Sequence, residues 1–496
     1  MQDNYVLGLS VLVPFAGAFV LAFVPANRSD LIRIFAVALA SLCFALSLYI
    51  FLSYDHALGG HQLRQEHVWV ESLGISFKLG VDGVSAVLIL LNGIVLLASV
   101  IVSWNLQTRN KEFFILLFLL VTGVYGIFET IDLFFLFFFY ELAVVPMYLL
   151  IGVWGSSTDF GSFARTKEYG AMKLVLYLTA GSMLVWIALL AIYAQANLGT
   201  FDLESLQTVE FPVVFQQIFF PILVVGFGVL AGLWPFHTWS PDGHVAAPTA
   251  VSMLHAGVLM KVGAYPILSV AITLFPEGAQ DWAPVLMGLA TINVLYGAIA
   301  AISQHDLKYV VAYSSVSHMG YVLMGLATLE PIGVSGAVLQ MFSHGIMTAL
   351  FFALVGVIYE QTHIRDITVL EGLSKRMGVT GIFFTVAALT SLGLPGLSGF
   401  VAEFLVFVGT FRTYPFLGFL AILGAAITAV YMLRLLSKVF FGPLPSQWEG
   451  LSDASRHEKW AMASLVLVLI GVGVWPFPLI RLIDSSVNVV LAGMGG

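Results

Sequence analysis

The 496-residue sequence has few charged residues. Only 10% are Asp, Glu, Lys or Arg, whereas 59% are hydrophobic. A soluble globular domain carries roughly 25% charged residues, and the mean hydropathy of this chain is +0.98. The deficit excludes a water-soluble enzyme and indicates a chain solvated by a lipid bilayer. The sequence also lacks a basic patch interleaved with aromatic residues, so we expect no nucleic-acid partner.

Cysteine is almost absent as well. Cys43 is the only one, and it lies in an apolar stretch. A single thiol forms no internal disulfide and by itself holds neither zinc nor an iron–sulfur cluster. The sequence has no glycine-rich dinucleotide loop, so we expect the chain to bind no cofactor or metal. The N-terminal segment lacks the basic n-region of a signal peptide, and we expect it to be a retained first span.

Long apolar runs are abundant instead. A transmembrane helix needs about 20 predominantly apolar residues, so we predict an all-α polytopic membrane protein with about fourteen transmembrane helices. The predicted helices cover residues 5–25, 31–52, 84–104, 113–131, 133–154, 168–195, 217–239, 251–275, 283–303, 307–329, 332–360, 379–412, 415–441 and 459–478. Residues 68–80 alternate apolar and polar, which predicts a short hairpin outside the bilayer. Residues 200–216 and 480–492 are typical of surface helices or loops.

Lysine and arginine are distributed unevenly between the two sets of loops. The loops after odd-numbered helices hold twelve, namely Arg28, Arg33, Arg109, Lys111, Arg165, Lys167, Lys308, Arg365, Lys375, Arg376, Arg456 and Lys459. The opposite loops hold four, namely Arg64, Lys78, Arg412 and Arg481. Because positive residues accumulate on the cytoplasmic side, we predict that both termini face the outer, periplasmic side of a bacterial plasma membrane.

Two predicted helices contain residues that break a helix. Helix 7 runs into WPFHTWSPDGHVAAP, and helix 12 contains GLPGLSG. Such backbone is tolerated in a membrane only where protein or water covers it. The breaks are five helices apart, as two inverted five-helix repeats (helices 4–8 and 9–13) predict; two unrelated proline kinks are the alternative. The predicted parts are N-terminal helices 1–3 (1–110), the first repeat (111–278), the second repeat (279–441) and a C-terminal helix 14 (442–496).

Ionisable residues occur near the middle of several predicted helices. Glu141 and Lys261 each lie near the centre of an otherwise apolar helix, and Glu403 follows the helix-12 break. A charge at the bilayer centre costs about 2.5–3.5 kcal/mol on insertion scales, so such a residue usually has a partner and a function. The structural alternatives are a neutral hydrogen-bonded acid for Glu141 and an ion pair for Lys261.

Five other ionisable side chains are candidates of the same kind. His318 and His344 lie near the middle of helices 10 and 11 among serine hydroxyls, and histidine exchanges protons near neutral pH. His237 flanks the helix-7 break, and His255 lies two turns before Lys261; capping of broken backbone or hydrogen bonding in the core is their alternative. Lys173 lies nearer a helix end, where its side chain can extend to the interface.

Other polar residues have structural interpretations. Asp82 and Asp132 stand at predicted helix starts, where a carboxylate caps free N–H groups. His305 and His318 are thirteen residues apart, a spacing that can stack two haem ligands. A haem b site needs matching histidines on a second helix, and His344 is the one available, so we expect no haem.

Four segments carry a family resemblance. They read FFYELAVVPMYLLIGVWG, WPFHTWSPDGHVAAPTAVSMLHAGVLMKVGAY, DLKYVVAYSSVSHMGYVLMGL and SLGLPGLSGFVAEFLVFVG. The chain resembles the antiporter-like membrane subunits of respiratory complex I along nearly its whole length. Related chains occur in multisubunit Na⁺/H⁺ antiporters and membrane-bound hydrogenases. The M-type subunit of this family has a glutamate on helix 12, where the L- and N-types have lysine, so Glu403 indicates the M type.

The resemblance implies a non-redox subunit that moves protons in an NADH- or ferredoxin-quinone oxidoreductase, beside L-type and N-type chains. Its protons are expected to pass from the cytoplasm to Lys261, then through His318 and His344 to Glu403 and outward. The residues that it matches to family positions are Glu141, Lys173, Lys261, His318, His344 and Glu403. An antiporter or hydrogenase subunit is one alternative, and a spacer that moves no protons is another.

The sequence departs from the family at the helix-7 break. Where the family has a lysine that pairs with the helix-5 glutamate, this chain has Leu230. The following loop reads PDGHVAAP, where PDAHVEAP is commoner. We therefore expect Lys173, or His255 with bound water, to supply the charge that Glu141 would otherwise lack.

Overall fold

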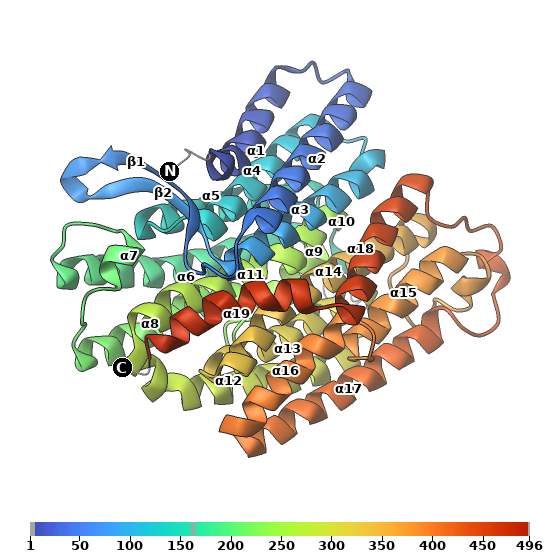
Figure 1. The fold of residues 1–496 in the computed structure, drawn as a ribbon. Helices are drawn as coiled ribbons and strands as arrows, with labels where there is room; N and C mark the ends of the chain where they lie inside the picture. The colour runs from blue at the N-terminus through green and yellow to red at the C-terminus, as the bar shows by residue number, and fades with distance from the viewer. Residues whose placement is uncertain (1–4, 160–163, 495–496) are drawn as a thin grey trace.

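The computed structural model describes residues 5–159 and 164–494. It is a bundle of long helices (Figure 1) with two small pairs of antiparallel strands. Within these residues, thirteen helical segments are long and apolar enough to cross a membrane. Twelve are continuous: α1 (Val6–Phe23), α2 (Ser29–Ser53), α3 (Gly83–Val102), α4 (Asn110–Glu129), α5 (Leu133–Trp154), α6 (Lys167–Ala196), α8 (Val213–Ala231), α12 (Pro276–Ile302), α13 (Leu307–Ala327), α14 (Pro331–Thr362), α17 (Pro415–Val439) and α18 (Arg456–Val474).

The remaining spans are interrupted. The thirteenth segment, Thr249–Ile272, consists of α10 (Thr249–Leu254), the π-helical turn η3 (His255–Leu259), α11 (Met260–Pro266) and a second π turn, η4 (Ile267–Ile272). Two shorter helices, α15 (Gly378–Ser391) and α16 (Ser398–Thr413), share the predicted twelfth helix. Helix 7 ends at Ala231 and continues as α9 (Trp239–Ala246). The all-α fold with broken helices 7 and 12 is confirmed, and the division into repeats stays a prediction.

The middle of the bundle holds the helices that carry most of the candidate residues. The most apolar window of α14 is 100% buried, and those of α13 and Thr249–Ile272 are 94% buried, against 33% for α2, α17 and α18. Ionisable residues within transmembrane segments usually face the interior of the bundle, because exposing them to lipid is costly. Lys261, His318 and His344 are therefore surrounded by protein.

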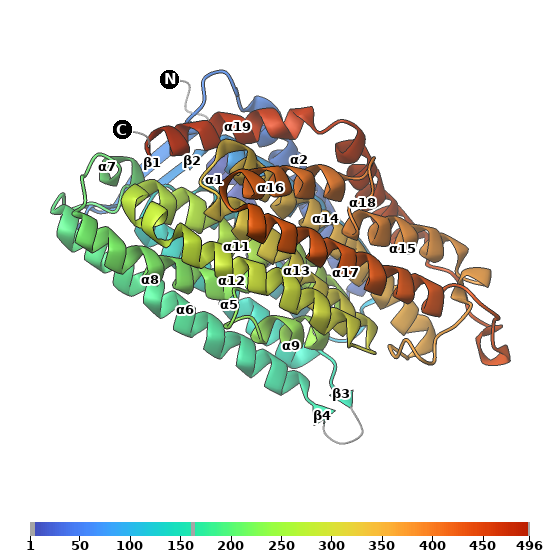
Figure 2. The ribbon, with the colours of Figure 1, turned by 90° about the horizontal axis from the view of Figure 1, so that it is seen from below.

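Short elements collect at the two ends of the bundle. The hairpin β1 (Gln62–Val70) and β2 (Ile75–Val81) is antiparallel, which confirms the predicted hairpin. It lies with α7 (Leu203–Leu206) and the C-terminal end of α19 (Phe477–Ala492) at one end, whereas β3 (Thr158–Asp159) and β4 (Ala164–Arg165) lie at the other (Figure 2). The predicted surface segments are thus the short helix α7 and the amphipathic helix α19.

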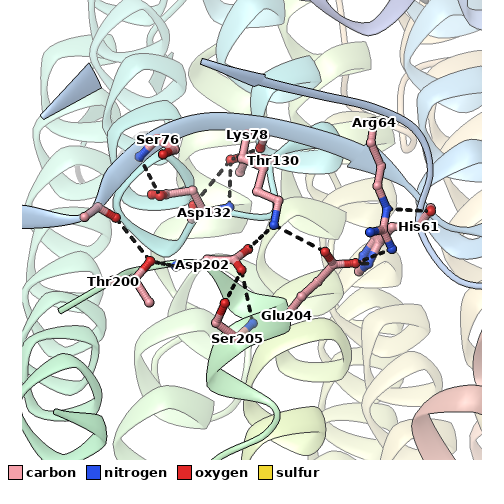
Figure 3. A network of polar contacts seen from close by, with 11 residues as sticks. His61, Arg64, Ser76, Lys78, Thr130, Asp132, Thr200, Asp202, Glu204 and Ser205 are labelled. Atoms are coloured by element: carbon pink, nitrogen blue, oxygen red, sulfur yellow. Dashed lines mark hydrogen bonds and ion pairs between the residues drawn. The ribbon is translucent and has the colours of Figure 1, made fainter. Parts of the chain in front are cut away.

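A polar network ties the hairpin to α7 (Figure 3). The Lys78 ammonium lies 2.7 Å from Asp202 and 3.3 Å from Glu204, and Arg64 lies 2.6 Å from Glu204. The His61 ring, 3.2 Å from Glu204, is the main reason that the pKa of this carboxyl falls to about 2. Asp132 caps α5 through the N–H groups of its first turn, as predicted, and burial raises its pKa to about 6.

Candidate functional site

A row of buried ionisable side chains crosses the middle of the bundle. The Lys261 ammonium donates to His344 Nδ1 at 2.7 Å and to the backbone oxygen of Ala256. The His344 and His318 rings are 5.4 Å apart, and His318 Nδ1 lies 3.2 Å from a carboxylate oxygen of Glu403. All four side chains are at most 3% exposed. The structure thus joins four of the predicted residues, which we call the central row (Lys261, His344, His318 and Glu403).

Hydroxyl and amide groups line the second half of the central row. His318 Nε2 lies 3.0 Å from the Ser391 hydroxyl at the end of α15, and the Gln340 amide lies 3.3 Å from His318 Nδ1. The Ser343 and Ser398 hydroxyls are 2.7 Å apart and connect α14 to α16. Polar groups that can both donate and accept hydrogen bonds suit a path along which protons move.

The break between α15 and α16 wraps around the Glu403 carboxylate. Gly393 has φ +70°, a left-handed conformation that favours glycine. A Cβ at Gly393 would stand 3.0 Å from a carboxylate oxygen of Glu403. The glycine in the GLPGLSG motif therefore lets the chain turn at a position where the backbone approaches the carboxylate closely.

Two π turns flank the segment that carries Lys261. In η3, a wider helical turn leaves the Ala256 carbonyl as an acceptor for the Lys261 ammonium, five residues on. The second turn, η4, follows Pro266, which has no backbone N–H to continue the α-helical pattern. Such π turns occur frequently at functional sites. Sequence reasoning missed both turns, although Pro266 is a signal for the second.

Three further buried histidines lie just before α9, on α9 and in η3. The His244 and His255 rings are 3.9 Å apart, and His255 stacks on Trp239. His237 makes an edge contact with Tyr296. All three histidines are at most 2% exposed, and none of their ring nitrogens has a hydrogen-bond partner within the described residues. Buried polar atoms are usually satisfied, with ordered water as the common partner where protein supplies none.

The buried carboxylate of Asp242 connects α9 to the neighbouring elements near the β3–β4 hairpin. Asp242 forms an ion pair with Arg165, accepts a 2.9 Å hydrogen bond from the Tyr309 hydroxyl, and lies 2.8 Å from the Lys173 ammonium. We call these four residues the Asp242 cluster. They come from β4, α6, α9 and α13, so the cluster connects the two halves of the chain.

The Asp242 cluster overturns the expected partnership between Lys173 and Glu141. Lys173 is six residues from the start of α6, or about 9 Å along the axis, whereas Glu141 is thirteen residues from the end of α5, or about 20 Å. The two groups therefore lie at different depths. The His255 ring contacts His244 and Trp239 and has no direct contact with Glu141, so a link through bound water stays a prediction.

Glu141 itself lies outside the central row. Its side chain is half-buried, and no hydrogen bond or ion pair joins it to another described residue. Leu230, where the family's lysine is missing, is fully buried in apolar surroundings. The structure therefore leaves this carboxyl partly exposed and without a direct contact to Lys261.

Sequence reasoning missed two groups of buried charges. Lys308 donates to the Ala247 carbonyl at 2.7 Å beyond the C-terminal end of α9, where a cation is favourable, and Arg365 pairs with Asp306 at 3.1 Å beside it. Glu129, at the end of α4, is fully buried and accepts hydrogen bonds of 2.7 and 2.8 Å from Ser10. Both groups lie at the ends of predicted helices, where sequence alone predicts that a charged side chain is exposed.

Known proteins share this architecture. Residues 130–428 match the family described as NADH:quinone oxidoreductase/Mrp antiporter, TM. NAD(P)H-quinone oxidoreductase chain 4 of Microcystis aeruginosa is 34% identical over 97% of this chain and 92% of its own. NADH-quinone oxidoreductase subunit M of Rickettsia prowazekii is 33% identical over 99% of both chains.

Solved structures agree. A chain of respiratory complex I from Thermus thermophilus with bound NADH gives a TM-score of 0.90 at 28% identity, covering 99% of this chain and 100% of that chain. A chain of the Mrp complex from Dietzia sp. gives 0.86 at 20% identity, covering 100% of both chains, which shows a shared fold. By sequence and by structure, this chain belongs to the family of antiporter-like membrane subunits common to NADH:quinone oxidoreductases and Mrp antiporters.

Proposed function

We propose that this chain is the M-type subunit of a quinone oxidoreductase complex and moves protons across the membrane while redox chemistry occurs in other subunits. The observation that carries the proposal is the central row, in which Lys261 contacts His344, the His344 ring neighbours His318, and His318 contacts Glu403. The relatives named subunit M and chain 4 support the same assignment.

The first step along the row is short. The 2.7 Å contact between Lys261 and His344 allows direct proton transfer, since one nitrogen donates while the other accepts. Two unit charges 4 Å apart at an effective dielectric constant of about 20 repel by about 4 kcal/mol. Lys261 and His344 therefore do not carry a positive charge together, and a proton arriving at one drives the other proton onward.

The second half of the row ends at an acceptor. The centres of the two histidine rings are 5.4 Å apart, and His344 Nε2 has no hydrogen-bond partner among the described residues, so this step needs a bridging water or a ring rotation. His318 then contacts the Glu403 carboxylate at 3.2 Å, beside the backbone break. We expect release from Glu403 to the outer side, on which the distribution of Lys and Arg places both termini.

Glu141 fits this scheme as a group that responds to a neighbour. It is half-buried at mid-bilayer depth and has no partner among the described residues. A carboxyl at that depth usually has a partner, so we propose that a side chain of an adjacent L-type or N-type subunit supplies it. The charge state of Glu141 would then report the state of the neighbour to this chain.

The proposal is tested with the assembled complex in proteoliposomes. Lys261→Ala and Glu403→Gln should lower proton uptake per electron, because each removes a member of the central row. Arg412→Gln is the control, since Arg412 forms an exposed ion pair with Glu330 far from the row. If Lys261→Ala pumped as the wild type does, the chain would be a spacer and not a proton carrier.

A further inference from the structure

The Asp242 cluster lies on the side of the chain from which the proposed function takes its protons. Side-chain exposure falls from 35% for Arg165 to 18% for Lys173 and 3% for Asp242. The cluster therefore runs from the surface to a buried carboxylate. That carboxylate lies on α9, the short helix that also carries His244, whose ring contacts His255.

Both oxygens of the Asp242 carboxylate are occupied. One accepts from the Arg165 guanidinium and the Tyr309 hydroxyl, and the other lies 2.8 Å from the Lys173 ammonium. A metal cation at this position would have to displace charged donors that are already in place. Within the cluster, two cations share this one carboxylate.

Beyond the cluster, the polar atoms are of the wrong type for an alkali cation. The side chains of His237, His244 and His255 offer nitrogen, and none of their ring nitrogens has a protein partner among the described residues. Hard cations are bound through oxygen ligands, whereas imidazole suits softer metals. A neutral imidazole can, however, accept a proton at one nitrogen and release the proton of the other.

We propose that the Asp242 cluster makes this chain select protons over Na⁺ and K⁺, by withholding the buried carboxylate of the helix that carries His244. Selection works first because Arg165, Tyr309 and Lys173 already occupy the carboxylate oxygens that a metal cation would need. It works second because the positive charges of Arg165 and Lys173 repel cations. The proposal rests on the proposed function, because it assumes that protons are what the central row receives.

The size of the charge effect sets the expected result. One unit charge at about 8 Å, with an effective dielectric constant of about 20, changes the local concentration of a monovalent cation about 30-fold. Replacing Arg165 and Lys173 with glutamine removes two positive charges and frees the carboxylate. We therefore expect the sodium concentration that half-inhibits proton uptake to fall at least about 30-fold.

The experiment uses the assembled complex in proteoliposomes, with proton uptake measured in sodium and in choline buffers and with ²²Na⁺ uptake measured in parallel. The wild type should give equal proton uptake in both buffers and no ²²Na⁺ uptake above background. Arg165→Gln/Lys173→Gln should be inhibited by sodium or should carry it. Adding Asp242→Asn should abolish that sodium response, because the triple variant has no carboxylate to bind the ion.

The controls separate the two proposals. Arg412→Gln/Glu330→Gln removes an ion pair at the other end of the bundle and should leave the sodium response as in the wild type. If the double variant does not assemble, Lys173→Gln alone frees one carboxylate oxygen and gives the same test. A double variant that stays indifferent to sodium overturns the selectivity proposal, whereas Lys261→Ala with normal proton uptake overturns the proposed function.

Discussion

Glu403→Gln tests the end of the central row most directly. The carboxylate lies 3.2 Å from His318 Nδ1, and both side chains are buried. A charge pair at about 4 Å and an effective dielectric constant of about 20 is worth about 4 kcal/mol. Glutamine keeps the shape and the hydrogen-bonding capacity but loses this attraction. The variant therefore removes up to about 4 kcal/mol of attraction for a proton that moves along the row to His318.

We expect Glu403→Gln to reduce proton uptake per electron by the share that this chain contributes, while quinone reduction in the uncoupled state continues. The assay measures both rates on the same proteoliposomes, with and without a protonophore. Glu403→Asp is the matched control, because it keeps the charge and shortens the side chain by one methylene. Unchanged stoichiometry in Glu403→Gln would refute the assignment of Glu403 as an acceptor of protons from His318.

Three other perturbations follow from the contacts. Gly393→Ala places a methyl group against the Glu403 carboxylate and strains a left-handed backbone position, so pumping should fall. Gly396→Ala is the control, because its φ is also positive but its methyl group would contact nothing, so it shows the effect of backbone strain alone. Ser10→Ala removes both hydrogen bonds to Glu129, and thermal unfolding of the complex should show a loss of about 1–3 kcal/mol; no change would contradict it. The pKa of Glu204 is lowered from its usual 4.5 to about 2, so the ionised carboxylate stabilises the hairpin contact fully above pH 4.5. This stabilisation is lost as the pH falls from 4.5 towards 2 and the carboxylate is protonated. Hydrogen exchange of residues 62–81 should rise in that window, and in Glu204→Gln it should be high already at neutral pH.

The transmembrane helices could be predicted because lipid offers no hydrogen bonds to the backbone. Each crossing must then be a helix of sufficient length, and composition alone reveals it. The helix breaks were visible in WPFHTWSPDGHVAAP and GLPGLSG because proline and glycine act locally. Asp82 and Asp132 were predicted as caps for the same reason, and the structure places Asp82 in a capping box with Ser85.

The partners of buried charges could not be predicted in the same way. Lys173 is close in depth to Asp242 and far from Glu141, a relation that depends on where four different elements pack. Lys308 stands at the start of α13, where sequence favours exposure, yet it is buried against the carbonyls that follow α9. Depth along one helix can be counted from sequence, but contact between helices is decided by packing.

The sequence by itself determined that this protein lies in a membrane, where its helices break, and which ionisable residues are buried at mid-bilayer depth. These properties depend on hydropathy and local backbone chemistry. Only the tertiary structure decided that Lys261, His344, His318 and Glu403 form one row, that Asp242 takes Lys173 and Arg165, and that Glu141 lies apart from them. The physical reason is that a buried charge is stabilised by whichever opposite charge or dipole the packed helices bring within a few ångströms.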